Sequence, residues 1–202
     1  MHHPMNKLFF PLIKTGLFFA MFTLLATACQ QNYVPKPRGY FRIDLPERAY
    51  TEMDSTLPYA FSYPVYCKIT HDVYAPNEPN WINVEFTGLN GKLHLSYKAI
   101  NHNLAKYIDD THMLVSKHIP KATAIEESQI SNPEHHVYGT IYKIQGSEAA
   151  SVYQFFVTDS VNHFIRGALY FNSEPNNDSL VPVIDFVSKD IDHLIETLRW
   201  KK

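Results

Sequence analysis

Residues 122–171, ATAIEESQISNPEHHVYGTIYKIQGSEAASVYQFFVTDSVNHFIRGALYF, contain the strongest architectural signal in the chain. The stretch divides into four segments rich in β-branched and aromatic residues, separated by turn residues such as Asn132-Pro133 and Asp159-Ser160. The four segments are 122–130, 136–145, 150–158 and 163–171. Consecutive strands joined by short turns pair with their neighbours, so this stretch predicts an antiparallel sheet.

The residues before this stretch predict further strands and one helix. Alternation of apolar and polar residues, which is typical of half-buried strands, occurs at 40–45, 59–65, 81–86 and 93–97. The last two segments are predicted to form a hairpin around a turn at 89–92. Between 101 and 119 the apolar spacing becomes helical, and Asn101 or Asn103 is available as the N-cap.

The clearest helix lies near the end of the chain. Apolar residues keep three-four spacing between Leu180 and Leu198, Asp178 or Ser179 is the expected N-cap, and Pro182 fits the first turn. Two main helices and about eight strands, four of them consecutive, predict an α+β fold around an antiparallel sheet.

Composition excludes two classes of protein. Of the 202 residues 45% are hydrophobic and 19% charged, so the chain can bury enough apolar surface to fold and is not a disordered protein. Residues 1–28 contain two lysines and no acidic residue, and their removal leaves 16 basic against 20 acidic side chains. The remaining chain is acidic, and we therefore expect no nucleic acid among its partners.

The first 29 residues predict export and a lipid anchor. Two lysines precede an uncharged run at 15–28, which is the pattern of a signal peptide. Ala26-Thr27-Ala28-Cys29 then resembles a bacterial lipobox, in which the cysteine is acylated after cleavage, although Ala26 stands where leucine is usual. The alternative is an uncleaved transmembrane helix at 8–28, which a proline, a lysine and a glycine would interrupt.

These features predict three parts of the chain. They are a lipoprotein signal peptide at 1–28, a lipidated tether at 29–39 and a single α+β domain at 40–202. Lipid attachment is assigned to Cys29, which leaves Cys67 without a partner for an intrachain disulfide. Cys67 lies in a mostly apolar run and is predicted to be a small buried hydrophobic residue.

Signals for catalysis and metal binding are weak. The sequence lacks nucleophile-elbow, metalloprotease and phosphate-loop motifs. Among the acidic residues and histidines of the first predicted helix, only Asp109 and His112 have the spacing that puts two ligands on one face. Asp190 and Asp192 are predicted to lie on a solvated helix face. We therefore expect no catalytic residue, no metal and no cofactor.

Arginines beside aromatic residues predict a recognition surface in two segments, 37–48 and 158–171. The candidate partner-binding residues are Arg38, Tyr40, Arg42, Asp44, Asp159, His163 and Arg166. The alternative is an intramolecular arginine–carboxylate pair that locks an edge strand.

Five segments resemble the gliding motility lipoprotein GldD family of Bacteroidetes. They are PRGYFRIDLPE at 37–47, WINV at 81–84, LSYK at 95–98, the stretch 158–171 and PNNDSL at 175–180. The resemblance implies an envelope lipoprotein needed for gliding and for the associated type IX secretion machinery, and only Cys29 carries over with a role. The order of strands and helices, together with FSYP at 61–64, also resembles the PsbP/Mog1 α/β/α sandwich.

The leading hypothesis is a non-catalytic lipoprotein of the cell envelope that contacts protein components of the gliding and secretion apparatus. Gln30-Gln31-Asn32 lacks the acidic run that resembles a surface-export signal, so we expect a periplasm-facing position, in the outer rather than the inner membrane. The alternative is a periplasmic module that binds a small ligand or metal, or an enzyme. It would use Asp109, His112, Asp159 or Arg166.

Overall fold

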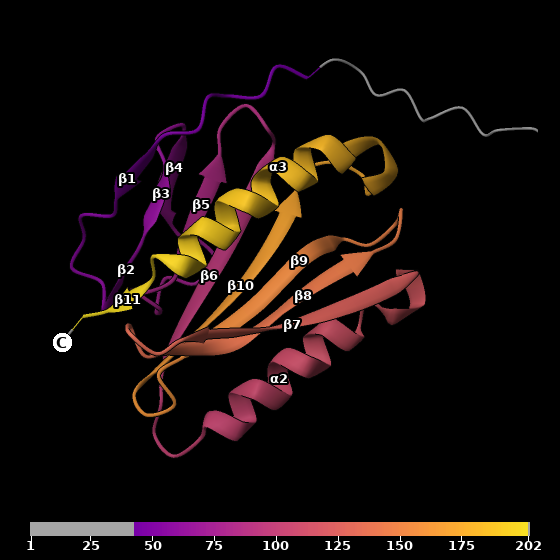
Figure 1. Ribbon diagram of the computed structural model, residues 1–202. Helices are drawn as coiled ribbons and strands as arrows, with labels where there is room; N and C mark the ends of the chain where they lie inside the picture. Colours follow the sequence, from indigo (N-terminus) through magenta and orange to yellow (C-terminus); the bar gives the residue numbers. More distant parts are fainter. Residues whose placement is uncertain (1–42, 202) are drawn as a thin grey trace, which may run out of the picture. The chain divides into compact units, whose positions relative to one another are not determined.

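The computed structural model describes residues 43–201, which form a seven-stranded antiparallel sheet, two small sheets and two α-helices (Figure 1). The strands are β1 (Tyr50–Glu52), β2 (Tyr59–Ala60), β3 (Ser62–Pro64), β4 (Cys67–His71), β5 (Ile82–Phe86), β6 (Gly91–Ala99), β7 (Ala124–Asn132), β8 (Val137–Gln145), β9 (Ser151–Thr158), β10 (His163–Phe171) and β11 (Arg199–Trp200). The helices are α2 (Leu104–Ser116), the 3-10 turn η1 (Ile119–Lys121) and α3 (Asn177–Glu196). The predicted α+β class is confirmed.

The four late strands form one half of the large sheet, whose order is β4-β5-β6-β10-β9-β8-β7. Each of β7, β8 and β9 pairs antiparallel with the next strand along the chain, as predicted. The predicted hairpin of β5 and β6 also forms, with Phe86 opposite Gly91. Pairing of β10 with β6 then joins the two halves.

The two helices lie on opposite sides of the large sheet (Figure 1). All eight residues of β9 are buried, which happens when both faces of a strand are covered. Phe155 belongs to the larger core with Val187 of α3, and the next residue, Phe156, belongs to the smaller core with Val115 of α2. The chain therefore forms the predicted α/β/α sandwich.

The larger core depends on a close approach at Gly167 of β10. A Cβ atom at this position would lie 2.1 Å from the ring of Phe155, a distance that two non-bonded carbons do not tolerate. Because Gly167 has no side chain, the fully buried Phe155 ring can lie across the strand. Burial of a phenylalanine side chain stabilises a fold by roughly 1.5–3 kcal/mol, so this packing contributes substantially.

The strand predicted at 40–45 is wrong in its described part. Residues 43–45 are not in a strand, residues 40–42 lie outside the described part, and the first strand begins at Tyr50. Residues 59–65 form two short strands in place of one, because β2 pairs with β11 whereas β3 pairs with β1. A strand persists only while one partner backbone continues beside it, and here the partner changes at Phe61.

Both helices form where predicted, but their N-termini differ in detail. Asn103, one of the two predicted caps, is at the N-cap position of α2, although its Oδ1 accepts a hydrogen bond from the backbone N–H of Asn101 at 2.8 Å. In α3 the N-cap position is Asn176, so neither Asp178 nor Ser179 is the cap. Pro182 therefore lies inside the helix, beyond its first turn.

Asn177 explains the early start of α3. Its buried side chain donates hydrogen bonds from Nδ2 to the carbonyl oxygens of Gly146 and Ala149, at 2.7 and 2.8 Å. These bonds anchor the first residue of the helix to the loop between β8 and β9. The contact is long-range in the sequence, so local capping signals could not predict it.

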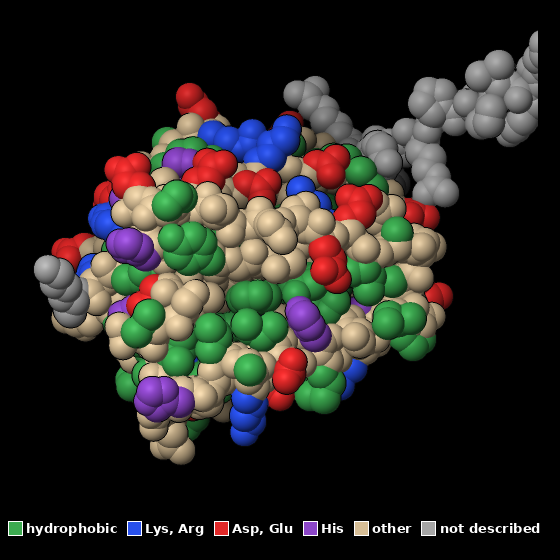
Figure 2. Space-filling view, turned by 60° about the horizontal axis from the view of Figure 1, so that its bottom comes forward, with side chains coloured by type: hydrophobic (Ala, Val, Ile, Leu, Met, Phe, Trp, Pro, Cys, Tyr) green, Lys and Arg blue, Asp and Glu red, His purple; other side chains and the backbone are tan. Residues whose placement is uncertain are grey.

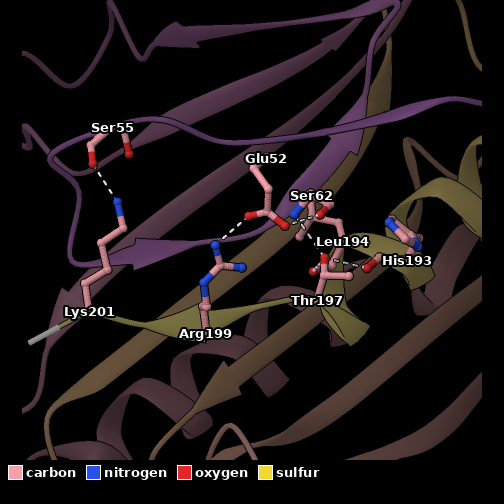
Figure 3. Close-up of polar contacts among 8 residues, drawn as sticks. All are labelled: Glu52, Ser55, Ser62, His193, Leu194, Thr197, Arg199 and Lys201. Carbon is pink, nitrogen blue, oxygen red and sulfur yellow. Dashed lines mark hydrogen bonds and ion pairs between the residues drawn. The ribbon is translucent and has the colours of Figure 1, made fainter.

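The two ends of the described chain are joined beside α3 (Figure 3). Glu52 accepts hydrogen bonds from Ser62 Oγ at 2.8 Å and from Arg199 Nη2 at 2.5 Å. Thr197 Oγ1 accepts a hydrogen bond from the backbone N–H of Ser62 and donates to the carbonyl oxygen of His193. These contacts attach the first strands to the segment that follows α3.

Candidate functional site

Asp159 and His163, two of the predicted partner-binding residues, lie at the turn between β9 and β10. Asp159 Oδ1 accepts hydrogen bonds from the backbone N–H groups of Val161, Asn162 and His163 at 2.8–2.9 Å. Burial acts to raise the pKa of Asp159, but the three backbone hydrogen bonds outweigh it and lower that pKa below its usual value. Asp159 therefore stabilises the turn, in which Ser160 has a φ of 69°.

His163 joins this turn to the end of the described chain. Its ring stacks on Trp200, with centroids 5.0 Å apart and 10° between the planes, and its Nδ1 lies 2.8 Å from the hydroxyl oxygen of Tyr97. Trp200 Nε1 donates a hydrogen bond to the carbonyl oxygen of His136 at 3.0 Å. Val161, at the tip of the turn, is 67% exposed.

We call this region the turn-end surface, and it borders a hollow of about 610 Å³. Its residues are Glu134, His135, His136, Asp159, Val161, Asn162, His163, Arg199, Trp200 and Lys201. An exposed apolar tip, a stacked aromatic pair and a polar rim are features of small recognition surfaces. Of these residues, the sequence predicted only Asp159 and His163. The segments 134–136 and 199–201 come beside them through the tertiary fold, which no local pattern indicates.

Arg166, another predicted partner-binding residue, does not belong to the turn-end surface. Its neighbours Ile165 and Gly167 face the larger core, so Arg166 points to the α2 side of the sheet. There its Nη2 donates a hydrogen bond to Gln154 Oε1 at 2.5 Å. The two halves of the predicted patch in β10 therefore lie on different faces.

The other predicted partner-binding residues come from the N-terminal segment. Asp44 is exposed. Arg38, Tyr40 and Arg42, together with the predicted lipid attachment site Cys29, lie outside the described residues. Their roles stay predictions.

An arginine–carboxylate pair of the kind left open by the sequence forms between Arg48 and Asp190, and we call this group the Asp190 cluster. Asp190 Oδ1 accepts hydrogen bonds from Arg48 Nε at 3.0 Å and from the Tyr50 hydroxyl at 2.8 Å. Its Oδ2 accepts one from the Tyr66 hydroxyl at 2.5 Å. The Arg48 guanidinium also lies over the ring of Phe186, 4.1 Å from its centroid. The cluster fixes the segment before β1 to α3.

The prediction that Asp190 is solvated is therefore wrong. Its side chain is 0% exposed, and it lies between Val187 and Leu194 on the buried stripe of α3. Three-four spacing from those residues is the signal that could have found it. Asp192, also predicted to be solvated, accepts a hydrogen bond from the buried Tyr153 hydroxyl.

The Asp190 cluster also affects titration. Burial, with a smaller effect of the hydrogen bond to Asp190, raises the pKa of Tyr50 to about 12. Burial, again with a contribution from Asp190, raises the pKa of the Cys67 thiol to about 12. Cys67 is buried, as predicted, and a thiol with this pKa is a poor nucleophile at neutral pH.

The residues of the enzyme or metal-site alternative do not converge. Asp109 and His112 are exposed on α2, Asp159 is in the β9–β10 turn, and Arg166 is in the middle of β10. Within residues 43–201, no three histidine, cysteine or acidic side chains have a geometry that could hold a metal ion. The arrangement gives no support to a shared reaction centre for these four residues.

Together, the described residues form an α/β/α sandwich domain whose β9–β10 turn has an exposed apolar tip beside a stacked aromatic pair. The family model for the gliding motility lipoprotein GldD matches residues 30–200, so the chain belongs to that family. This match confirms the resemblance found in the sequence segments.

Other comparisons add little to this assignment. No curated protein matches the chain. Among solved structures it resembles cyanobacterial PsbP (CyanoP) from Synechocystis sp. PCC 6803, with 10% identity, 79% of this chain and 97% of that chain covered, and a TM-score of 0.47. A likeness of this size carries no conclusion about function. None of the helices within residues 43–201 has the length and hydrophobicity needed to span a membrane.

Proposed function

We propose that the chain is a non-catalytic accessory lipoprotein of the gliding apparatus and the associated type IX secretion machinery, and that it acts through contacts with their protein components. Membership of the gliding motility lipoprotein family supports the biological setting. The separation of Asp109, His112, Asp159 and Arg166 supports a binding role over a catalytic one. We propose no cofactor and no nucleic-acid partner.

The proposed anchor is the acylated Cys29. Residues 1–28 would be removed, residues 29–39 would form the tether, and residues 40–202 the domain. Acyl chains contribute about 0.8 kcal/mol for each buried methylene group, so more than one chain gives stable attachment. Mass spectrometry of the mature N-terminus tests this, and an unmodified Cys29 in membrane-extracted protein would contradict it.

The proposed position is periplasm-facing, in the outer rather than the inner membrane. The absence of an acidic run in Gln30-Gln31-Asn32 supports the inward orientation. Protease treatment of intact cells should leave the domain uncut until the outer membrane is opened. Digestion in intact cells would place the domain on the cell surface instead.

The proposed partner contact is the turn-end surface. One observation carries this assignment: the exposed Val161 lies in the same turn as His163, whose ring stacks on Trp200. Apolar and aromatic side chains surrounded by a polar rim provide most of the binding free energy in small interfaces. Arg38, Tyr40, Arg42 and Asp44 remain further candidates for the same contact.

A pair of matched surface variants tests the contact. Val161→Glu places a negative charge at the centre of the turn-end surface, whereas Met113→Glu places one on α2, where Met113 is 55% exposed. We expect Val161→Glu to lose crosslinks to a component of the apparatus in native membranes and to impair gliding. Met113→Glu should keep both.

The two variants also control for folding, because neither native side chain is buried. Equal thermal midpoints would show that the charge acts on binding and not on stability. If Val161→Glu keeps every crosslink and normal gliding, the turn-end surface is not the partner contact.

A further inference from the structure

Arg166 is a largely covered cation that lacks an acidic partner. Its Nη2 donates to the neutral amide oxygen of Gln154, and its Nε is buried without an acceptor. Within residues 43–201, where several exposed lysines and arginines form ion pairs, Arg166 forms none. Burial of a charged group without an opposite charge costs desolvation free energy, so packing alone does not account for an arginine at this position.

The side chains that interact directly with Arg166 are the neutral Gln154 and Tyr170. Gln154 is fully buried and donates a hydrogen bond from Nε2 to His118 Nε2 at 2.9 Å. His94 lies opposite the small Ala168 in the neighbouring strand, on the same face as Arg166. Burial, and secondarily the charge of Arg166, lowers the pKa of His118. Burial also lowers the pKa of His94, against the opposing effect of Asp72 and with smaller contributions from Lys92 and Arg166. Both histidines therefore favour the neutral form at pH 7, and Asp72 Oδ2 lies 4.0 Å from His94 Nδ1.

A hollow opens on the same face of the sheet and is lined by Tyr170, whose side chain interacts with that of Arg166. It has a volume of about 710 Å³, and its lining includes Lys68, Tyr74, Glu85, Lys92, His94 and Tyr170. The rings of His94 and Tyr170 meet edge to face with centroids 5.7 Å apart, so these two residues connect the hollow to the surroundings of Arg166.

The lining favours a ligand with a negative charge and an extended body. Lys92 forms an ion pair with Glu85 at 3.0 Å, while Lys68 adds a further positive charge at the rim. Tyr74 is 92% exposed, which leaves its ring available for contact. Exposed tyrosines supply a large contact area at low conformational cost.

We propose that Arg166 binds the oxyanion of an anionic ligand, a carboxylate or a phosphate, whose remaining part lies in the hollow between Tyr74 and Tyr170. A guanidinium presents several N–H donors in a plane, which suits both groups, and the partial burial strengthens the interaction. The ligand would supply the negative charge that the protein does not provide. This site is separate from the turn-end surface and does not depend on the proposed partner contact.

The arginine side-chain NMR spectrum of the full chain in detergent offers a direct test, because the chain contains only five arginines. Inorganic phosphate and citrate are titrated separately against a constant chloride background. The Arg166 Nε–H signal should shift saturably with at least one of them, and the stronger response distinguishes phosphate from carboxylate recognition. No shift at Arg166, or an equal shift at all five arginines, would overturn the proposal.

Two substitutions separate binding from folding. Arg166→Met should weaken binding by about ten-fold to a hundred-fold, as expected for loss of a charge-assisted contact, and should leave the thermal midpoint unchanged or raised. Arg199→Met, which removes the ion pair with Glu52, should lower the midpoint slightly and keep binding. A midpoint that falls more in Arg166→Met than in Arg199→Met would assign the charge a structural role and overturn the proposal.

A third variant tests ligand binding in the hollow even if Arg166→Met does not fold. Tyr74→Ala changes a side chain that is almost fully exposed, so the fold should be unaffected. Binding of citrate or phosphate through the hollow predicts a several-fold weaker affinity in this variant. Unchanged affinity would exclude the hollow as the place of the ligand.

Discussion

The α3 side of the large sheet is closed by a continuous core and by the Asp190 cluster, whereas the α2 side has a smaller core and keeps polar side chains within the sheet. On the α3 side, the buried carboxylate of Asp190 accepts hydrogen bonds from three residues. On the α2 side, the Nε of Arg166 has no acceptor among residues 43–201.

The two sides of the sheet therefore differ in how completely their covered charged groups are hydrogen-bonded. The α3 side includes the contacts that hold both ends of the described chain, and the Asp190 carboxylate is paired there, whereas His193 Nε2 has no hydrogen-bond partner within residues 43–201. Figure 2 views the molecule from the α2 side and shows apolar side chains gathered near its middle, with charged and histidine side chains scattered around them. We infer that the α3 side, with its larger core, provides most of the stability.

The largest effect is expected at Asp190. Asp190→Ala leaves Arg48, Tyr50 and Tyr66 without their shared acceptor and should lower the free energy of unfolding by about 3 kcal/mol. Asp185→Ala, at an exposed position of the same helix, should change it little. Urea denaturation of both variants measures the difference, and equal midpoints would contradict the stabilising role of the Asp190 cluster.

The next largest effect is expected at Gly167. A methyl group there meets the Phe155 ring, so Gly167→Ala should destabilise the fold by about 2 kcal/mol through overpacking. Adding Phe155→Leu should restore part of that loss, because the smaller side chain makes room for the methyl group. Strictly additive effects in a double-mutant cycle would show that the two residues do not compete for the same space.

Alkaline pH should lower the stability of the fold through Tyr50, on the α3 side. Tyr50 keeps its proton in the folded state up to about pH 12, whereas the ordinary value is 10.0. A raised pKa contributes stability below the ordinary value, and that stability is lost as the pH rises from 10.0 to about 12. Tyr50→Phe should reduce this loss and cost about 1.5 kcal/mol at neutral pH, since it removes a hydrogen bond to a carboxylate.

The control for the alkaline effect is Tyr74→Phe, at an exposed tyrosine outside the Asp190 cluster. Its stability should follow the wild-type dependence between pH 10 and about 12. If both variants behave alike, Tyr50 is not the group responsible.

The smallest effect is expected on the α2 side, where acidic pH should lower the stability of the fold. The pKa values of His94 and His118 are lowered, mainly by burial, so the unfolded chain takes up protons before the folded chain. Stability present above the ordinary value of 6.5 is therefore lost as the pH falls below it. Thermal midpoints of His94→Gln and His118→Gln should fall less steeply with decreasing pH than that of the wild type. Parallel curves would show that these histidines do not contribute.

Much of the fold could be predicted because its signals are local. The alternation in the four late segments gave strands that pair as expected, and the apolar spacing gave both helices. The predicted boundaries are wrong where a residue contacts a segment far away in the sequence. Asn177 is an example, because its side chain binds the β8–β9 loop and α3 starts earlier than predicted.

The candidate site was less predictable for a related reason. Asp159 and His163 were identified from composition, but Trp200 and His136 reach them only through the order of strands in the sheet. Arg166 lies three residues from His163 in the sequence and yet faces the opposite side, because side chains alternate along a strand.

Periodicity alone predicted the α+β class, and the sequence shows basic residues 1–28 followed by an acidic remainder, because hydrophobic spacing and charge are properties of neighbouring residues. The environment of individual polar groups depended on the assembled fold. Asp190 acquires its three hydrogen-bond donors, and Arg166 its neutral partner Gln154, only when segments apart in the sequence come together. Pairing and desolvation act through space, and a linear pattern does not contain those distances.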